Sequence, residues 1–201
     1  MSRDVREILA AAKAGDSEVL GRLLEGYRQY LSVLAGIEIG RRLQGKVDQS
    51  DLVQEVFLHA HQYFPAFRGT EEAQLIVWLR EILAGTLANQ VRRYVGTQAR
   101  DIRLEEGLAA DLGQSSAMLA AVPVSPEGTP SEQLMHGEVS LAVAGAIAGL
   151  PEHYRTVIVL RHLEGLSFPE VASRMGKTVD SVEKIWVRAL GSLRAALREK
   201  S

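Results

Sequence analysis

Arginine, amide and aromatic side chains gather at the end of the longest segment with helical periodicity. The sequence there is Ala-Asn-Gln-Val-Arg-Arg-Tyr, residues 88–94. Arginine pairs with phosphate, amides hydrogen-bond to base edges, and an aromatic ring stacks on bases. These residue types indicate contact with nucleic acid, although arginine at a helix C-terminus also balances the helix dipole. The residues expected to make this contact are Asn89, Gln90, Arg92 and Arg93.

A second set of polar side chains follows a tight turn near the C-terminus. Ser167 and Glu170 have the spacing of a capping box, which begins a helix. Gly176 suits the left-handed end of that helix, and Thr178 can cap the next one. The pattern predicts a helix-turn-helix, whose second helix enters the DNA major groove. The exposed candidates on this second helix are Lys177, Thr178, Ser181, Lys184 and Arg188.

A third polar set lies on one side of a predicted amphipathic helix. Asp51, Gln54 and Glu55 face away from its apolar stripe. Asp51 and Glu55 are four residues apart, so two like charges are neighbours on the helix surface. Such a face is either simply solvated or a docking surface for a basic partner helix.

Nothing in the chain matches a catalytic or metal-binding pattern. His59 and His61 are two residues apart on a predicted helix and point to different sides, which argues against a metal pair. The sequence contains no glycine-rich phosphate loop and no Gly-x-Ser-x-Gly motif. We therefore predict no catalytic residue, no metal site and no cofactor.

The composition is typical of a globular protein inside the cell. Hydrophobic residues make up 46% of the chain and charged residues 24%, which is enough to form cores. The absence of cysteine suits a reducing compartment. No apolar run approaches the roughly 20 residues that cross a bilayer, and the N-terminus lacks the apolar centre of a signal peptide. We expect a soluble, cytoplasmic protein without membrane insertion.

The elements that must position these side chains all have helical periodicity, so the predicted fold is all-α. Four helices precede a segment rich in proline, serine and glycine, and four follow it. The predicted helices are Val5–Ala14, Ser17–Leu34, Asp51–Phe64, Glu71–Tyr94, Ser131–Gly149, Pro151–Leu163 and the two helices of the helix-turn-helix.

Two domains and a linker follow from this layout. Residues 1–99 form the first domain, residues 100–130 the linker and residues 131–201 the second domain. Residues 101–138 carry seven acidic side chains and one basic, whereas residues 174–200 carry seven basic and three acidic. The formal net charge of −2 therefore hides an acidic middle and a basic C-terminal end.

The motifs and their order resemble the extracytoplasmic-function (ECF, group 4) sigma factors of bacterial RNA polymerase, within the sigma-70 family. Asp-Gln-Ser-Asp-Leu-Val-Gln-Glu-Val-Phe-Leu, residues 48–58, is similar to region 2.2. Residues 78–93 resemble regions 2.3 and 2.4, and residues 150–190 resemble region 4. The similarity covers roughly residues 15–98 and 131–198.

This resemblance implies a protein that binds core RNA polymerase, directs it to a two-part promoter and assists DNA melting. Asp51, Gln54 and Glu55 would contact the clamp helices of the largest subunit. The cluster at 88–94 would lie on the −10 element, and the Pro65–Glu72 loop would receive a flipped base. The helix-turn-helix would read the −35 element, with the polymerase flap as a further partner. An anti-sigma factor is a typical partner of the family.

Four positions differ from the usual family pattern. Gly85 and Asn89 stand where Asn and Asp are common, and Glu183 and Ile185 stand where Lys and Arg are common. These differences bear on the promoter sequence and on strand opening, but leave the core-binding motif unchanged. Two alternatives remain open: a helix-turn-helix regulator that binds an operator, and a sigma-like interaction protein that acts as a decoy without promoter activity.

Overall fold

The chain forms helices in every part that the structure describes. The computed structural model describes residues 2–43, 47–95, 102–121 and 134–199, and no strand occurs within these ranges. The fold class is therefore all-α, as predicted. The chain divides into two compact units, Met1–Gln114 and Ser115–Ser201.

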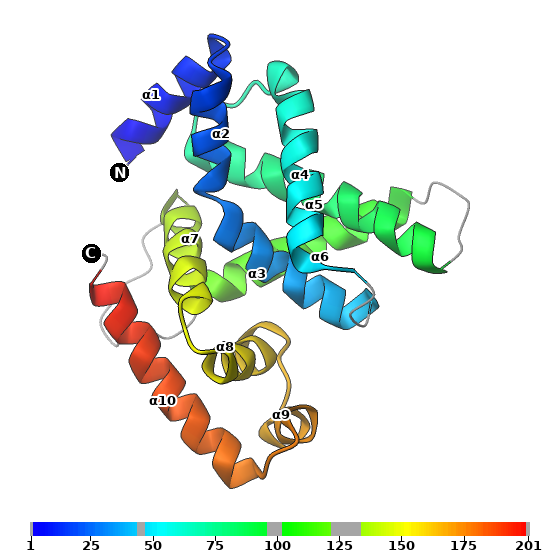
Figure 1. Ribbon diagram of the computed structural model, residues 1–201, viewed down its shortest axis with the longest axis vertical. Coiled ribbons are helices and arrows are strands. Elements are labelled where there is room, and N and C mark those ends of the chain that lie inside the picture. Colours follow the sequence, from blue (N-terminus) through cyan, green and yellow to red (C-terminus); the bar gives the residue numbers. More distant parts are fainter. Residues whose placement is uncertain (1, 44–46, 96–101, 122–133, 200–201) are drawn as a thin grey trace. The chain divides into compact units, whose positions relative to one another are not determined.

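The N-terminal unit is a set of helices around a shared apolar core (Figure 1). Its elements are α1 (Ser2–Lys13), α2 (Ser17–Glu25), α3 (Arg28–Glu38), the π-helical turn η1 (Ile39–Leu43), α4 (Gln49–Tyr63), the 3-10 turn η2 (Phe64–Ala66), α5 (Glu72–Val95) and the first part of α6 (Ile102–Ala120).

The predicted helix Ser17–Leu34 is in fact two helices, α2 and α3. The chain turns at Gly26 and Tyr27, between α2 and α3. Tyr27 directly precedes α3 and has φ −97° and ψ −2°. Tyr27 is buried, and its hydroxyl donates a hydrogen bond to Glu72 Oε1 at 3.0 Å. Glycine weakens a helix locally, and this contact with α5 favours the turn over a continuous helix.

Helices α4 and α5 pack against each other and form the centre of the N-terminal unit. Asp48 begins α4, because its side chain accepts hydrogen bonds from the backbone N–H groups of Ser50 and Asp51. The apolar stripes of the two helices are fully or almost fully buried. Their buried side chains are Leu52, Val53, Val56 and Ala60 on α4 and Leu75, Leu79, Leu83 and Leu87 on α5. The opposite faces of both helices are left for polar and aromatic side chains.

The segment that we interpreted as a linker contains the 19-residue helix α6, so the N-terminal side has more helices than the four predicted. Leu108 and Leu112 are completely buried, and they are one helical turn apart. The prolines of the segment indicated a connection, but they all lie beyond α6. The boundary between the two units falls within this helix. Residues 122–130 of the predicted linker lie outside the described residues.

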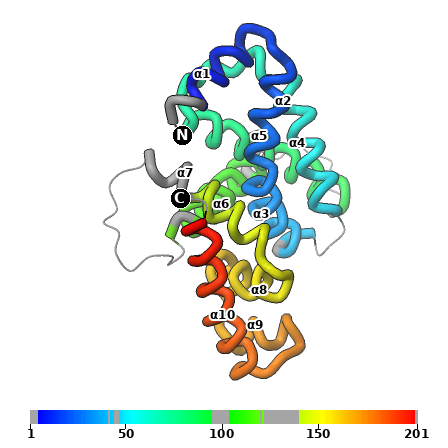
Figure 2. The backbone as a smooth tube through the Cα atoms, turned by 60° about the vertical axis from the view of Figure 1, so that its left-hand side comes forward, coloured from blue at the N-terminus to red at the C-terminus, as the bar shows by residue number. Residues whose placement is uncertain are grey.

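The C-terminal unit contains α7 (Leu134–Ala148), α8 (Glu152–Ile158), the π-helical turn η3 (Val159–Leu163), α9 (Phe168–Met175) and α10 (Val179–Arg198). Helix α10 lies along α8 and α9 in both views (Figures 1 and 2). Val171 of α9 and Val182 of α10 are fully buried where these helices meet. The predicted helix Pro151–Leu163 is α8 followed by η3.

Within the described ranges, none of the helices has the length and apolar character needed to cross a membrane.

Candidate nucleic-acid interface

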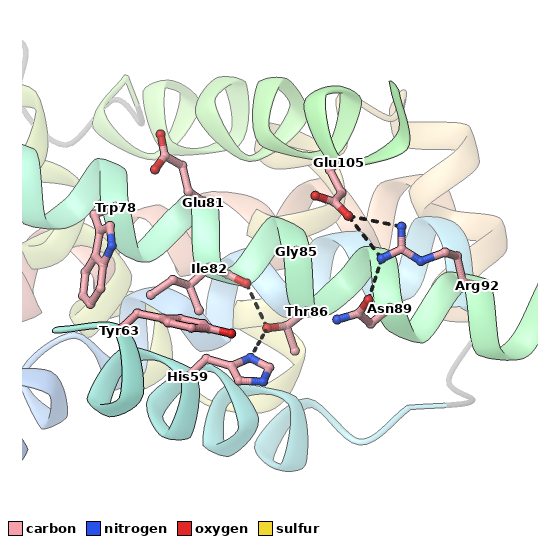
Figure 3. A pocket seen from close by; sticks show the side chains of 10 residues that line it. All are labelled: His59, Tyr63, Trp78, Glu81, Ile82, Gly85, Thr86, Asn89, Arg92 and Glu105. Atoms are coloured by element: carbon pink, nitrogen blue, oxygen red, sulfur yellow. Dashed lines mark hydrogen bonds and ion pairs between the residues drawn. The ribbon is translucent and has the colours of Figure 1, made fainter. Parts of the chain in front are cut away.

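A groove of about 590 Å³ runs along the exposed side of α5 in the N-terminal unit. Helix α4 forms one wall, and the beginning of α6 contributes to the other (Figure 3). The lining residues are His59, Tyr63, Trp78, Glu81, Ile82, Gly85, Thr86, Asn89, Arg92 and Glu105. Figure 3 shows Trp78 and Tyr63 at one end of the groove and Arg92 with Glu105 at the other. The groove therefore joins an aromatic end to a charged end.

The charged end contains the predicted residues Asn89 and Arg92, and both are already engaged. The Arg92 guanidinium forms an ion pair with Glu105 at 3.1 Å, and it also donates to Asn89 Oδ1. Arg92 is mostly buried by this arrangement, with a side-chain exposure of 16%. A carboxylate thus occupies the position on the guanidinium that a phosphate would take.

Gln90 and Glu55, predicted for two different partners, lie side by side. The Gln90 amide donates a hydrogen bond to Glu55 Oε2 at 2.9 Å, which connects α5 to α4. Asp51 and Gln54 are exposed on α4, whereas Glu55 is half-buried. Arg93 is exposed near the end of α5. The structure therefore brings Glu55 next to Gln90 of the predicted −10 cluster and leaves Asp51 and Gln54 on the open face of α4.

A short chain of hydrogen bonds connects the middle of α5 to α4. The Thr86 hydroxyl is 2.8 Å from the carbonyl oxygen of Ile82 and 3.2 Å from His59 Nδ1. Thr86 itself is buried, and His59 is half-buried in the wall of the groove. About two helical turns before Thr86, Trp78 packs against Phe67 with 4.9 Å between ring centroids.

Gly85 leaves the floor of the groove open. A Cβ atom at this position would meet nothing within 4 Å, so no packing contact demands glycine here. The free space lies between Trp78 and Asn89 on the same face of α5. A base or a larger side chain can therefore approach the α5 backbone at this point.

The helix-turn-helix has the capping contacts that the sequence predicted. The Ser167 backbone N–H donates to Glu170 Oε2 at 2.7 Å, and the Ser167 contacts lower the pKa of the Glu170 carboxyl. Gly176 has a left-handed φ of 61° at the end of α9. The Thr178 hydroxyl accepts a hydrogen bond from the Ser181 N–H and so begins α10. Thr178 therefore has a structural role whatever else it contacts.

The predicted reading face of α10 is open. Lys177, Thr178, Lys184 and Arg188 are exposed, and Ser181 is half-buried. Lys184 forms an ion pair with Asp180 at 2.7 Å, one turn earlier on the same helix. Glu183 is exposed on this helix and Ile185 is half-buried, so the face carries acidic as well as basic groups.

An aromatic cluster holds α10 against η3 and α9. The Trp186 indole N–H donates to His162 Nε2 at 3.0 Å, and the Phe168 ring packs edge-on against Trp186. Burial lowers the pKa of His162 from its ordinary value of 6.5, and the positive charge of Arg161 lowers it further. A neutral His162 is the form that can accept the indole hydrogen bond.

Sequence reasoning missed the side chains that form the walls of the groove. Glu105 belongs to the predicted linker, and Tyr63 and Thr86 carry no motif. The signal that could have marked this wall is Tyr63, an aromatic residue on the otherwise polar side of α4. Its exposed fraction in the structure is 51%. His59 was considered only as a metal ligand, and within the described residues no group of three acidic or histidine side chains is arranged to hold a metal.

Comparison with known proteins supports the two-domain arrangement of motifs. Residues 140–193 match the family described as Sigma-70, region 4. The ECF RNA polymerase sigma-E factor of Haemophilus influenzae is 29% identical over 182 residues, which cover 90% of this chain and 89% of that protein. The protein of the same name from Escherichia coli K12 is 27% identical over 90% of this chain and 88% of its own length.

A solved structure of an RsbN–BldN complex contains a chain with 22% sequence identity, covering 92% of this chain and 96% of that one, with a TM-score of 0.30. The region 4 match identifies the C-terminal unit as a helix-turn-helix domain of the sigma-70 type. Over 90% of its length, the chain is similar to extracytoplasmic-function sigma factors. These similarities support the function of an RNA polymerase sigma factor.

Proposed function

We propose that this protein binds core RNA polymerase through the open face of α4 and directs it to promoters with −35 and −10 elements. The observation that carries the proposal is the presence, in one chain, of two polar helix faces in the family's order. The first is the α4–α5 face and the second is the outer face of α10. Similarity to sigma-E factors at both regions supports this assignment.

The polymerase contact is assigned to Asp51, Gln54 and Glu55. Asp51 and Gln54 are exposed on α4, and the opposite side of this helix is buried. An acidic, rigid helix face suits the basic surface of a partner helix, here the clamp helices of the largest subunit. The flap of the polymerase is the proposed partner of the C-terminal unit.

The −10 contact is assigned to Asn89, Gln90, Arg92 and Arg93 with the adjoining groove. Arg93 is the exposed cation, and it is available to a phosphate from the outset. Arg92 reaches phosphate only when its ion pair with Glu105 opens. Strand opening therefore exchanges an internal carboxylate for the DNA backbone at this position.

The −35 contact is assigned to the N-terminal half of α10. Lys177, Ser181 and Arg188 are the side chains proposed to reach DNA, with Lys184 after release from Asp180. Thr178 contributes mainly by fixing the start of the helix. Glu183 disfavours phosphate nearby, so binding of this unit alone is expected to be weak and strongly salt-dependent.

We further propose residues 1–99 as the region 2-like domain, 131–201 as the region 4-like domain and the acidic segment between them as their connection. The protein contributes no covalent chemistry, because polymerase forms the phosphodiester bonds. It acts in the cytoplasm, where polymerase and promoters are located. An anti-sigma factor is a further proposed partner.

Run-off transcription tests the proposal. Purified core polymerase is incubated with a library of random promoters, with and without this protein. Promoter-dependent transcripts that require the protein are the expected result. A footprint of the protein alone without transcripts would instead indicate an operator-binding regulator. Neither footprint nor transcripts would indicate the decoy.

Charge reversal on α4 tests the docking face. Asp51→Lys with Glu55→Lys is expected to abolish co-purification with core polymerase, because two attractive charges become repulsive. His61→Lys with Gln62→Lys places two lysines on an exposed part of the same helix and serves as the control. Equal polymerase binding by the two double variants would show that Asp51 and Glu55 do not contribute to the interface.

Loss of the arginines tests the −10 assignment. Arg92→Ala with Arg93→Ala is expected to weaken open-complex formation at least tenfold, because two phosphate contacts are lost, while polymerase binding is retained. Permanganate footprinting of unpaired thymines measures the open complex. Undiminished opening by this variant would contradict the role of the α5 end.

A further inference from the structure

We infer that residues 102–114 of α6, here called the α6 segment, are autoinhibitory and keep DNA from the end of α5. The segment belongs to the N-terminal unit together with α5. The inference rests on the proposed function, because it concerns the access of DNA to Arg92. It goes further by assigning the block to the docking of the whole segment, whereas a single ion pair would act at Arg92 alone.

Two carboxylates attach the α6 segment to different elements of the N-terminal unit. Glu105 pairs with Arg92 of α5 at 3.1 Å (Figure 3), and Asp111 pairs with Arg42 of η1. The two acidic residues are six positions apart, which corresponds to about 9 Å along a helix. Glu105 therefore covers the proposed DNA contact. Asp111 holds the segment at a second point, on an arginine to which no DNA contact is assigned.

The second anchor, Arg42, is also held by a residue outside α6. Its Nε donates a hydrogen bond to Glu38 Oε2 at 3.1 Å, and Glu38 is fully buried. A guanidinium carries donors on more than one side, so Arg42 can bind Glu38 and Asp111 at the same time. Arg42 therefore offers a positive group in a fixed place, to which the α6 segment can return after release.

Apolar side chains lie between the two acidic anchors. Leu108 and Leu112 are completely buried, and their spacing of four residues places them on one face of the helix. Burial of these side chains supplies attraction without direction, whereas the ion pairs at Glu105 and Asp111 fix the position of the segment. We therefore expect the segment to dock and leave as a unit, so that weakening Asp111 also loosens Glu105.

The α6 segment has two glycines that its packing does not require. Gly107 and Gly113 lie inside the helix, where glycine is less favourable than alanine. A Cβ atom at Gly107 would meet nothing within 4 Å, and one at Gly113 would make an ordinary contact with Arg80 at 3.9 Å. A segment of this length is also marginal as an isolated helix in water. Release of the segment is therefore expected to unfold it, and the glycines make release easier.

The docked segment places a carboxylate where DNA would place a phosphate. Glu105 and a phosphate compete for the same guanidinium, and Arg92 is largely covered while the segment is docked. In holoenzyme, polymerase and α10 would hold promoter DNA close to α5, and the resulting high local concentration of phosphate favours displacement of Glu105. The free protein lacks this advantage. Autoinhibition therefore makes DNA binding at α5 depend on polymerase.

The first test weakens docking at a distance from Arg92. Holoenzyme is formed from core polymerase and the full chain, and its affinity is measured for a fluorescent promoter fragment with a preformed bubble at −10. Asp111→Asn should raise this affinity about twofold to fivefold, the range expected from loss of a partly exposed ion pair. Glu106→Gln removes the same charge from an exposed position of the same segment. As the matched control, it should bind like the wild type.

The second test strengthens docking and predicts the opposite result. Gly107→Ala favours the helical, docked form, and it should lower the affinity for the same DNA about threefold to fivefold. Gly21→Ala in α2 is the matched control, because a Cβ atom there also meets nothing within 4 Å. It stabilises another helix of the N-terminal unit and should leave the affinity unchanged.

Hydrogen exchange of the backbone amides measures docking in the free protein, without DNA or polymerase. Asp111→Asn should speed exchange in residues 102–114, and Gly107→Ala should slow it. If exchange changes in this way while the affinity for DNA does not, the segment docks without inhibiting. Exchange that neither variant alters, or an affinity gain in Glu106→Gln equal to that of Asp111→Asn, would also overturn the inference.

Failure of the proposed function gives a different result. If the wild-type holoenzyme binds the bubble no better than core polymerase, the proposed function and this inference both fail. If it binds well, and Glu105→Gln raises the affinity while Asp111→Asn and Gly107→Ala do not change it, only the inference is overturned. The block would then be a single ion pair at Arg92.

Discussion

The end of α5 and the start of α10 carry similar side chains but hold them in different ways. At the end of α5, Arg92 and Gln90 bond to carboxylates on other helices, Glu105 of α6 and Glu55 of α4. On α10, Lys184 pairs with Asp180, one turn away on its own helix. The first region is enclosed by long-range contacts, whereas the second depends on local contacts and remains open.

This difference indicates how each region can respond to DNA. On α10, the exposed ion pair offers little resistance to a phosphate, because such pairs contribute about 0–1 kcal/mol. At the proposed −10 contact on α5, DNA would have to compete with carboxylates that are partly shielded from water. The α5 region is therefore expected to bind DNA only in a context that moves those carboxylates aside, whereas α10 presents its face at all times.

The largest expected effect concerns the local geometry of the helix-turn-helix. Gly176→Val places a β-branched residue at φ 61° and should reduce the free energy of unfolding of the C-terminal unit by about 2 kcal/mol. Gly191→Val, inside α10 where a Cβ meets nothing within 4 Å, is the control and should change it by less than about 0.5 kcal/mol. Urea denaturation measures both. Similar losses would show that backbone strain at the turn does not control this unit.

The next effect tests the enclosure of the α5 end. Glu105→Gln removes the ion pair, so Arg92 becomes available and the affinity of the holoenzyme for bubble DNA should increase about threefold to tenfold. Stability should fall slightly, by about 0.5 kcal/mol, because an acidic residue is lost from the first turn of α6. The prediction is therefore that Glu105→Gln raises the affinity for bubble DNA and lowers the stability of the protein. Weaker DNA binding would mean that Glu105 positions Arg92 and does not compete with DNA.

A smaller effect concerns pH and the contact between His162 and Trp186. Because the pKa of His162 is lowered on folding, the unfolded chain binds more protons as the pH falls below about 6.5. The stabilising contribution is therefore complete above pH 6.5 and is lost as the pH falls toward the folded-state pKa. His162→Gln retains an acceptor for the indole without titrating. Thermal unfolding from pH 8 to pH 5 should show a larger decrease in Tm for the wild type than for this variant.

The smallest effect is expected at the local ion pair of α10. Asp180→Asn should change the free energy of unfolding by less than about 0.5 kcal/mol, since both partners are largely exposed. Affinity of the holoenzyme for a −35 element should rise no more than about twofold. A gain as large as that of Glu105→Gln would remove the contrast between the two regions. Parallel titrations of both variants on the same promoter provide the comparison.

The sequence predicted the elements whose ends are set by local chemistry. Ser167, Gly176 and Thr178 have the predicted places at helix ends, because capping depends on neighbouring residues. The turn between α2 and α3 was not predicted, since Tyr27 is held there by Glu72, 45 residues later. Helix α6 was also missed, although Leu108 and Leu112 have helical spacing, because nearby prolines and acidic residues suggested a connection.

The candidate site was predictable only in its residue types. The amide and arginine cluster at the end of α5 follows from composition and position. The pairs Gln90–Glu55 and Arg92–Glu105 join residues 35 and 13 positions apart, and periodicity within one helix cannot reveal them. The same is true of His59 and Thr86, which meet only because α4 packs on α5.

The two sides of α5 have different tolerance for change over evolutionary time. Leu79, Leu83 and Leu87 are completely buried, so a substitution on that side disturbs the core. Gly85 faces open space, and a new side chain there meets no neighbour. A single mutation at this position can alter what the groove admits while the fold stays intact. If the groove contacts promoter DNA as proposed, promoter preference can diverge between close relatives without any compensating change in the core.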